Sequence, residues 1–180
     1  MCDSSTYQNR VHDFAEKSDP FIFTNDGIGN AVIVSKEIFD HAKENVYIYC
    51  GQLNKKLTSD QLYFNSLISF LESGKKLKVL VSEIDGEYSP ALQRVIEKSK
   101  VTNQVECRYL ENNADINSHF TFNGNNNVHF TVADNKSFRI EFDPKEYKAF
   151  CSFNNIEISG KLTSIFLKYF DLASPIPHLS

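Results

Sequence analysis

The chain has 180 residues, of which 41% are hydrophobic and 23% are charged, a balance that argues against a disordered, collagen-like or coiled-coil protein. Its formal net charge of -4 at pH 7 argues against a nucleic-acid coat and a polybasic membrane anchor. A chain of this length can bury enough surface to fold around one core without a disulfide or a metal, so we expect a single domain.

The N-terminus and the cysteines indicate a cytoplasmic protein. Residues 1–6 are polar and acidic, whereas a signal peptide would be basic and then apolar. No run in the sequence approaches the roughly 20 apolar residues that span a bilayer. The cysteines lie far apart without a Cys-x-x-Cys pair, so we expect free thiols in a reducing compartment at Cys2, Cys50, Cys107 and Cys151.

The first predicted elements follow a polar N-terminal segment, residues 1–19. Residues 20–23 and 31–34 are apolar and flank the turn-rich segment 25–30, a pattern that predicts two strands joined by a loop. Ser35 is the expected N-cap of a short helix that follows the second strand.

The middle of the chain predicts a βαβ unit. Residues 46–50 are almost all apolar, as in a strand that is covered on both faces. A helix beginning at Ser59 or Asp60 has apolar residues at three- and four-residue spacing and ends near Gly74. Residues 77–81 form the next buried strand, and the two strands should be parallel.

The following segments predict a further helix, a strand and a long connection. Ser89 and Pro90 begin the helix, since proline is tolerated in a first helical turn. Residues 105–110 alternate in the way of a strand with one exposed face. Residues 111–127 are rich in Asn, Asp and Ser, so we expect a long loop or a disordered excursion.

The C-terminal third predicts an antiparallel part of the sheet and a closing helix. Residues 128–132 and 137–142 are strand-like and flank Asp134-Asn135, which is typical of a hairpin turn. Residues 149–153 add another strand, and apolar residues over 158–170 predict an amphipathic helix that docks on the sheet.

The alternating elements predict an α/β domain with a mixed β-sheet flanked by helices. Their order, with the strand 130–134 and the closing helix 166–171, resembles one half of the phospholipase D superfamily over about residues 30–172. We therefore expect a single phospholipase D-like domain over residues 20–174, after the N-terminal segment 1–19 and before a C-terminal tail, residues 175–180.

The resemblance implies a particular kind of active site. Members of this family use a His-x-Lys-x4-Asp motif in which the His attacks phosphorus, the Lys holds the phosphate and the Asp follows closely. Two such motifs must meet, one supplying the nucleophile and the other the general acid. A chain with one motif must therefore dimerise.

The motif is degenerate in this sequence. Aligned on Asp134, it has Asn127 at the His position and His129 at the Lys position, so that only Asp134 matches. Aligned on His129 instead, it has Thr131 for the Lys and Lys136 for the Asp. An amide is a poor nucleophile and a histidine is only partly charged near neutral pH, so we expect the ordinary mechanism to be lost.

Other motifs are weaker. The only His-x-Lys, residues 41–43, lies on a predicted helix and has Ile48 where the Asp belongs. Gly27-Ile28-Gly29 lacks the third glycine of a dinucleotide fingerprint, and residues 160–163 lack the preceding glycine of a phosphate loop. We therefore expect no cofactor, and the absence of a Cys-x-x-Cys pair predicts no bound metal.

These residues predict a catalytically inactive binding or assembly module, acting as a homodimer or beside a partner protein. A phosphate-bearing ligand, such as a nucleic acid or another phosphodiester, would be held near His129, Arg139 and Glu141. The catalytic candidates are His129, Asp134 and Asn127. Each also has a plain structural interpretation: a hydrogen-bonded histidine, an Arg139–Glu141 ion pair on one strand face, a hairpin turn and a loop residue.

Two alternatives remain open at this point. The first is a divergent, metal-independent phosphodiesterase or nuclease in which His129 from two chains supplies the nucleophile and the acid. The second is a pure protein-interaction subunit without a small ligand, which would have an exposed apolar patch.

Overall fold

The computed structural model describes residues 4–53, 55–84, 86–120 and 127–176. Within these residues, strands form one mixed eight-stranded sheet in the order β1-β7-β6-β5-β2-β3-β4-β8. The central β2, β3 and β4 are parallel, and the remaining pairs are antiparallel. The strands are β1 (Phe23–Asn25), β2 (Asn45–Cys50), β3 (Lys76–Val81), β4 (Val105–Tyr109), β5 (His129–Ala133), β6 (Ser137–Asp143), β7 (Lys148–Ser152) and β8 (Ser174–Pro175).

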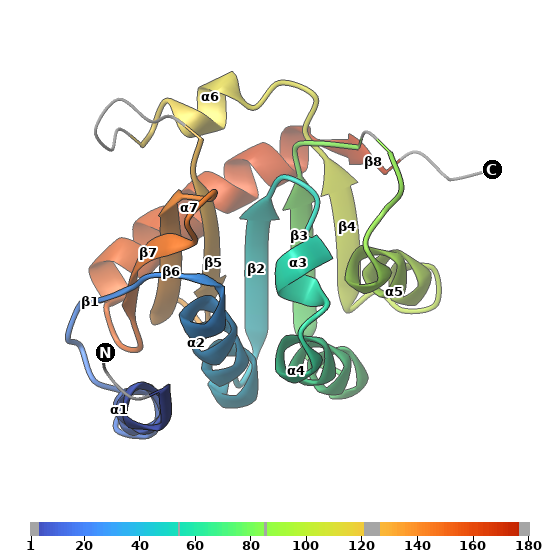
Figure 1. The fold of residues 1–180 in the computed structure, drawn as a ribbon. Coiled ribbons are helices and arrows are strands. Elements are labelled where there is room, and N and C mark those ends of the chain that lie inside the picture. The colour runs from blue at the N-terminus through green and yellow to red at the C-terminus, as the bar shows by residue number, and fades with distance from the viewer. Residues whose placement is uncertain (1–3, 54, 85, 121–126, 177–180) are drawn as a thin grey trace.

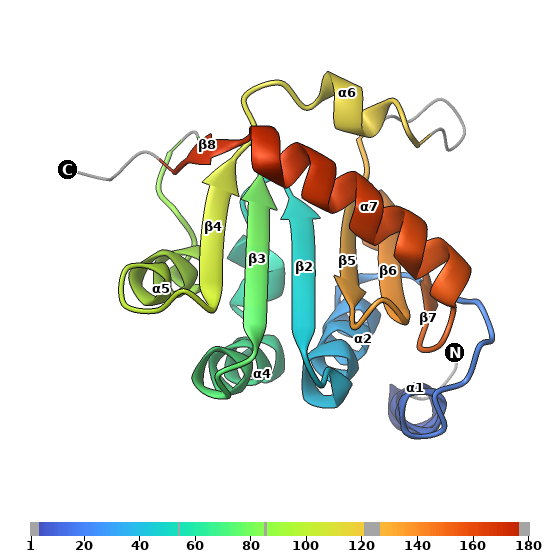
Figure 2. The ribbon, with the colours of Figure 1, turned by 180° about the vertical axis from the view of Figure 1, so that it is seen from behind.

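Helices cover both faces of the sheet (Figures 1 and 2). On one face lie α1 (Ser4–Glu16), α2 (Ile28–His41), α3 (Lys55–Thr58), α4 (Gln61–Glu72) and α5 (Pro90–Ser99). The long helix α7 (Ile156–Leu172) crosses the other face, and α6 (Ala114–Asn117) lies beyond one edge of the layers. The expected α/β architecture, a mixed sheet flanked by helices, is confirmed.

The βαβ unit of β2, α4 and β3 is present as predicted. Asp60 is the N-cap of α4 and its carboxylate accepts the N–H of Leu62 at 2.8 Å. β2 and β3 pair in parallel with Val46 opposite Leu77. Ser89 likewise caps α5, where its hydroxyl accepts the N–H of Leu92 at 3.2 Å.

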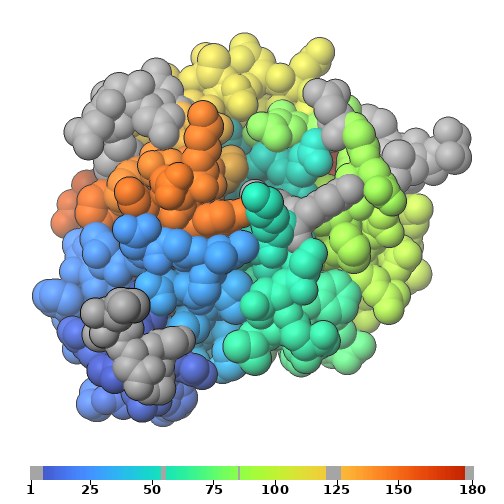
Figure 3. Space-filling view, in the orientation of Figure 1, coloured from blue at the N-terminus to red at the C-terminus, as the bar shows by residue number. Residues whose placement is uncertain are grey.

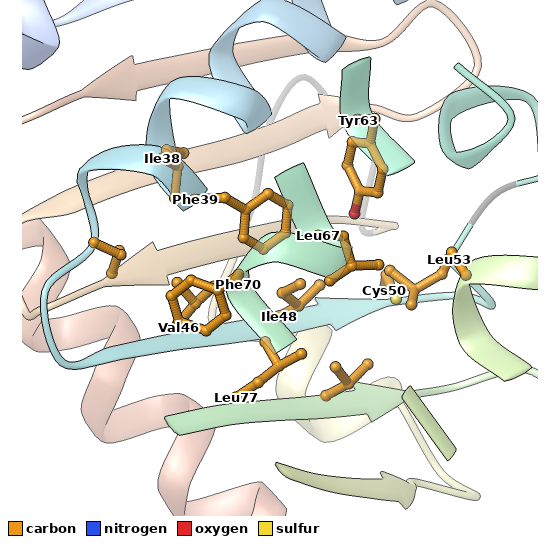
Figure 4. Close-up of a cluster of buried hydrophobic side chains, with 14 of the residues drawn as sticks. Ile38, Phe39, Val46, Ile48, Cys50, Leu53, Tyr63, Leu67, Phe70 and Leu77 are labelled. Carbon is orange, nitrogen blue, oxygen red and sulfur yellow. The ribbon is translucent and has the colours of Figure 1, made fainter. Parts of the chain in front are cut away.

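A hydrophobic core fills the space between the sheet and the helices α1, α2, α4 and α5. Figure 4 shows its centre, where Phe39 of α2 and Phe70 of α4 pack over Ile48 of β2. The rings of Phe39 and Phe70 lie 5.8 Å apart, in a tilted arrangement that aromatic pairs favour. This core fixes α2 and α4 on the sheet.

A second core lies under α7, on the other face of the sheet. Tyr47 of β2 stacks on Phe166 of α7 with their ring centroids 5.1 Å apart. Phe130 of β5 is buried in the same cluster. Because both faces of β2 and β5 are covered, these strands hold their side chains in fixed positions.

Three predictions for the N-terminal part are wrong. Residues 31–34 belong to α2, which begins at Ile28 after the N-cap Gly27, so the predicted strand and the cap at Ser35 do not exist. Ala31 to Val34 are all buried in a helix packed on the sheet and on neighbouring helices, and such an apolar run also suits a buried strand. The predicted strand 20–23 shares only Phe23 with β1, and the segment 1–19 contains α1.

The connection 111–127 contains the short helix α6 instead of being loop throughout, and its residues 121–126 lie outside the described part of the chain. The tail residues 177–180 and Cys2 also lie outside it. Cys50, Cys107 and Cys151 are free thiols. Burial raises the pKa of Cys50 and of Cys151 to about 12, so both stay protonated and unreactive.

No helix in the described ranges has the length and apolar character needed to cross a membrane.

Candidate functional site

A cavity of about 700 Å³ opens beside the carboxyl end of β2. β2 pairs with β3 on one side and with β5 on the other, so the chain order reverses at this strand. Such a reversal is where open α/β sheets bind their ligands. Figure 3 shows this face of the molecule, on which α2, α3 and the connection between β6 and β7 come together.

Strand register brings three of the predicted ligand-binding residues to this cavity. β5 and β6 pair with His129 opposite Glu141 and Thr131 opposite Arg139. These side chains share one face of the sheet because alternate residues of a strand point the same way. Phe130 lies between His129 and Thr131 in the sequence and belongs to the core under α7, on the other face of the sheet. His129, Arg139, Glu141 and the exposed Asn127 all line the cavity.

Both ring nitrogens of His129 have partners within the chain. The backbone N–H of Gly51 donates to Nε2 at 3.2 Å, and Nδ1 lies 3.2 Å from Oε2 of Glu141. Since Nε2 accepts a hydrogen bond, the proton of a neutral ring lies on Nδ1, which donates to the carboxylate. This side chain is therefore a hydrogen-bonded histidine at the edge of the cavity.

Arg139 and Glu141 form a buried ion pair on β6. Nη2 of Arg139 donates to Oε1 of Glu141 at 2.7 Å, and Nε donates to Oδ1 of Asn25 at 3.0 Å. Nη2 also reaches the carbonyl of Tyr147 at 3.3 Å. Arg139 is 5% exposed and Glu141 is 6% exposed, so this pair is shielded from bulk water.

These contacts set the charge of Glu141. Burial alone would raise the pKa of this carboxyl, but the hydrogen bond from His129 and the charge of Arg139 outweigh it and lower the pKa below its ordinary value. Glu141 is therefore a carboxylate at neutral pH, and its charge is compensated by Arg139.

Several lining residues were not among the predicted site residues. Lys56 of α3 and Lys145 of the β6–β7 connection bring positive charge to the cavity, while Glu83 brings a carboxylate. Tyr63 of α4 adds a hydroxyl, and burial raises its pKa, so it stays protonated. The carboxylate of Glu83 lies so close over Gly51 that a Cβ there would be 2.9 Å from an oxygen.

One sequence signal could have identified part of this set. Gly51 directly follows β2 and Glu83 lies two residues after the end of β3, and the carboxyl ends of parallel strands are where such folds place their sites. Lys56 and Lys145 lie on a one-turn helix and a turn, which no sequence periodicity places next to these strand ends.

The structure places Asp134 at the far end of β5, away from His129. Asp134 lies five positions after His129 along the strand, which corresponds to roughly 17 Å at about 3.3 Å per residue. The Asp134 carboxylate accepts backbone N–H groups of Lys43, Glu44 and Asn45 at 2.6 to 2.9 Å. Asp134 therefore holds the turn before β2 and does not reach the cavity.

The segment 151–154 also lies apart from the cavity lining. Ser152 is buried and its hydroxyl donates to the carbonyl of Pro20 at 3.2 Å. The same hydroxyl accepts the N–H of Asn154 at 3.4 Å. The first of these contacts links β7 to the segment before β1.

Comparison with known proteins gives matches in structure and none in sequence. No family model and no curated protein matches the chain. Nuc from Salmonella typhimurium, a phospholipase D family member, is 12% identical with a TM-score of 0.59, covering 88% of this chain and 100% of Nuc. NucT from Helicobacter pylori is 11% identical with a TM-score of 0.60, covering 87% of this chain and 100% of NucT.

A third similar structure is TrmBL2, an archaeal chromatin protein whose structure shows a mode of DNA binding. It is 13% identical with a TM-score of 0.57, covering 89% of this chain, which spans 55% of TrmBL2. At these identities the likeness concerns the fold alone. Together with the mixed sheet and its order, it shows that this chain has the fold of phospholipase D family members.

Proposed function

We propose that this chain is a catalytically inactive phospholipase D-like domain whose cavity binds a phosphate-bearing ligand. The observation that carries the proposal is the engagement of His129, whose Nε2 accepts the Gly51 N–H while Nδ1 is held by Glu141. A histidine nucleophile must present a ring nitrogen to phosphorus. Here both nitrogens already have partners.

The rest of the site supports the same conclusion. Asn127, at the position of the family's nucleophile in the Asp134 alignment, has an amide that cannot form a phosphoenzyme. Arg139, which also lines the cavity, is buried in its ion pair with Glu141. Among the described lining residues, the cavity thus has groups that suit an anion, while neither His129 nor Asn127 is poised to attack it.

Positive charge at the cavity rim suits a phosphate group. Lys56 and Lys145 line the cavity from two different elements, and an ammonium binds phosphate as a compact charge with three donors. Lys145 is exposed, so its side chain can move to contact a bound ligand without breaking a contact with a buried residue. The DNA binding described for TrmBL2 makes an oligonucleotide a reasonable first ligand to test.

The test is binding of a fluorescent oligonucleotide and of inorganic phosphate to the parent, Lys145→Ala and Lys100→Ala. We expect Lys145→Ala to weaken binding roughly tenfold, because a hydrogen bond to a charged group contributes about 1.5 kcal/mol. Lys100 is also exposed but ends α5, so Lys100→Ala removes the same charge elsewhere. Equal affinity of all three proteins would contradict the proposal.

A second candidate function is a metal-independent phosphodiesterase or nuclease that works as a homodimer. The His129–Glu141 contact favours it, because a carboxylate that accepts the Nδ1–H bond fixes the orientation and tautomer of an imidazole. This mechanism requires the Gly51 segment to withdraw from Nε2 and a second His129 to supply the acid. It predicts cleavage that persists in the presence of a chelator and is lost in His129→Ala.

Self-association is part of the proposed function as an assembly module. Phe21 and Ile22 are 57% and 42% exposed beside the edge strand β1. They border a groove of about 360 Å³ that is also lined by Phe14 and Phe23. An exposed aromatic patch of this kind is typical of a protein interface.

A further inference from the structure

Two histidines and two glutamates from α1 and α2 converge away from the cavity. Nδ1 of His12 lies 3.1 Å from Oε2 of Glu37, and Nε2 of His41 lies 3.2 Å from the same oxygen. Nε2 of His41 also lies 3.8 Å from Oε1 of Glu16. The ligand atoms of His12, Glu37 and His41 all lie within 4.8 Å of one another.

Helix geometry explains this convergence. His12 and Glu16 are four residues apart on α1, and Glu37 and His41 are four residues apart on α2, so each pair shares a helix face. Val11 and Ala15 of α1 are buried, which fixes α1 in its position beside α2, as seen in Figure 1. The two pairs therefore face each other across one helix interface.

We propose that His12, Glu37 and His41 form a binding site for a divalent transition metal ion of the zinc type, with Glu16 as the fourth ligand. Two imidazoles and a carboxylate are ligands that zinc accepts. In a tetrahedral site with bonds of about 2.0 to 2.1 Å, neighbouring ligand atoms lie roughly 3.3 Å apart. The separations of 3.1 and 3.2 Å from Glu37 Oε2 are close to this value.

The surroundings of Glu37 prepare it for this role. Nζ of Lys36 contacts the other carboxylate oxygen, Oε1, at 3.1 Å and also contacts Asp40 at 2.7 Å. Oε2 is therefore directed toward the two imidazoles, as outer partners orient metal ligands. The side chain of Glu37 is only 3% exposed, while those of His41 and His12 are 27% and 52% exposed. An ion can thus reach a largely buried carboxylate from solvent.

The bound ion would fasten α1 to α2. The two helices contribute ligands from both sides of their interface. The ion would therefore link them through coordinate bonds that the unfolded chain lacks. None of the four ligands lines the cavity at the end of β2. Metal binding and phosphate binding are therefore separate properties, and failure of one leaves the other standing.

The experiment is titration of chelator-treated full-length protein with Zn²⁺ by calorimetry and with Co²⁺ by its visible absorption. We expect one equivalent to bind, with the intense bands of tetrahedral Co²⁺, and the melting temperature to rise with Zn²⁺. His12→Ala and His41→Ala should each weaken Zn²⁺ binding at least tenfold. His119→Ala is the matched control, because His119 contacts Tyr169 beside α7 and not this cluster.

Several results separate a metal site from a simple ion-pair cluster. Equal Zn²⁺ affinity of the parent and the His12→Ala/His41→Ala double variant would overturn the proposal, since binding would then occur elsewhere, for instance at a cysteine. So would the absence of Zn²⁺ and Co²⁺ binding by the parent. Far-ultraviolet circular dichroism without metal checks that each variant is folded. Loss of binding in both single variants with retention in His119→Ala would support the site.

Discussion

At the scale of single residues, the contacts of Arg139 decide how the cavity wall is held. Its guanidinium joins Glu141 of its own strand to Asn25 of β1, and Glu141 in turn holds His129 of β5. Removing one partner of a buried pair leaves an uncompensated charge, which costs far more than losing an exposed pair. The network is therefore a structural element as well as part of the candidate site.

We expect Arg139→Met to lower the free energy of unfolding by about 3 to 5 kcal/mol, because Glu141 would remain buried without its cation. Urea denaturation measures this change. Arg94→Met is the control, because Arg94 contacts Glu97 at 3.1 Å on the exposed surface of α5 and its loss should cost less than about 1 kcal/mol. Similar losses for the two variants would show that the Arg139 pair contributes no more than a surface contact.

The lowered pKa of Glu141 gives a pH prediction with a definite sign. The folded state binds fewer protons at this group than the unfolded state, so Glu141 stabilises the fold above its ordinary pKa of 4.5. That stabilisation is lost as the pH falls through the lower pKa of the folded protein. The difference in unfolding free energy between the parent and Glu141→Gln should shrink below about pH 4.5. A constant difference from pH 7 to about pH 3 would contradict this assignment.

At the scale of elements, the hairpin between β5 and β6 also fixes the start of β2. Asp134 and Asn135 have φ values of 53° and 57°, the left-handed conformation that a tight hairpin turn requires. The Asp134 carboxylate holds three successive N–H groups from residue 43 to residue 45. Asp134 is thus a structural anchor between the β5–β6 hairpin and the start of β2.

We expect Asp134→Ala to cost about 2 kcal/mol of unfolding free energy, because a charged acceptor of backbone N–H groups is lost. Ligand affinity at the cavity should stay unchanged at temperatures where the variant is folded. Asn135→Gly should be neutral or stabilising, since glycine adopts a positive φ without strain. A selective loss of binding in folded Asp134→Ala would assign this residue to the site.

The elements that the sequence predicted correctly carry local signals. The caps at Asp60 and Ser89, the buried runs of β2 and β3 and the Asp134-Asn135 turn all have their own residue patterns. The apolar run 31–34 predicts a strand but belongs to α2, because a helix that is buried on nearly every side is as uniformly apolar as a buried strand. Only the packing of this segment against residues distant in the sequence distinguishes the helix from a strand.

From the sequence, the cavity residues could be proposed only through the motif alignment, which named Asn127 and His129, and through strand alternation. Arg139 and Glu141 are two residues apart on β6, so their shared face followed from the sequence. The Gly51 N–H on His129 and the cavity lysines depend on how β2, α3 and the β6–β7 connection meet in space. The contact between His12 and Glu37 likewise depends on the packing of α1 on α2. The expectation of no bound metal rests on the cysteine spacing alone.

At the scale of the whole molecule, the sheet ends in β1 beside an exposed apolar patch. Edge strands and exposed aromatic side chains are the surfaces through which domains associate. Phe21 and Ile22 lie at this edge, next to the groove between α1 and β1. The proposed assembly would therefore use a surface separate from the cavity.

We expect Phe21→Ser/Ile22→Ser to weaken self-association at least about tenfold, because interface aromatics contribute much of the binding energy. Sedimentation velocity over a range of concentrations measures the change. Val101→Ser is the control, since Val101 is 77% exposed after α5, away from the patch. Identical sedimentation of the parent and both variants as monomers would rule out a homodimer through this surface.

The most direct test of catalytic inactivity is hydrolysis of a phosphodiester reporter and of single- and double-stranded nucleic acid in chelator, with the parent beside His129→Ala. We expect no cleavage by either protein, because both ring nitrogens of His129 have hydrogen-bond partners within the chain. Cleavage by the parent that disappears in His129→Ala would contradict the proposed inactivity and make His129 a nucleophile or acid of a working enzyme.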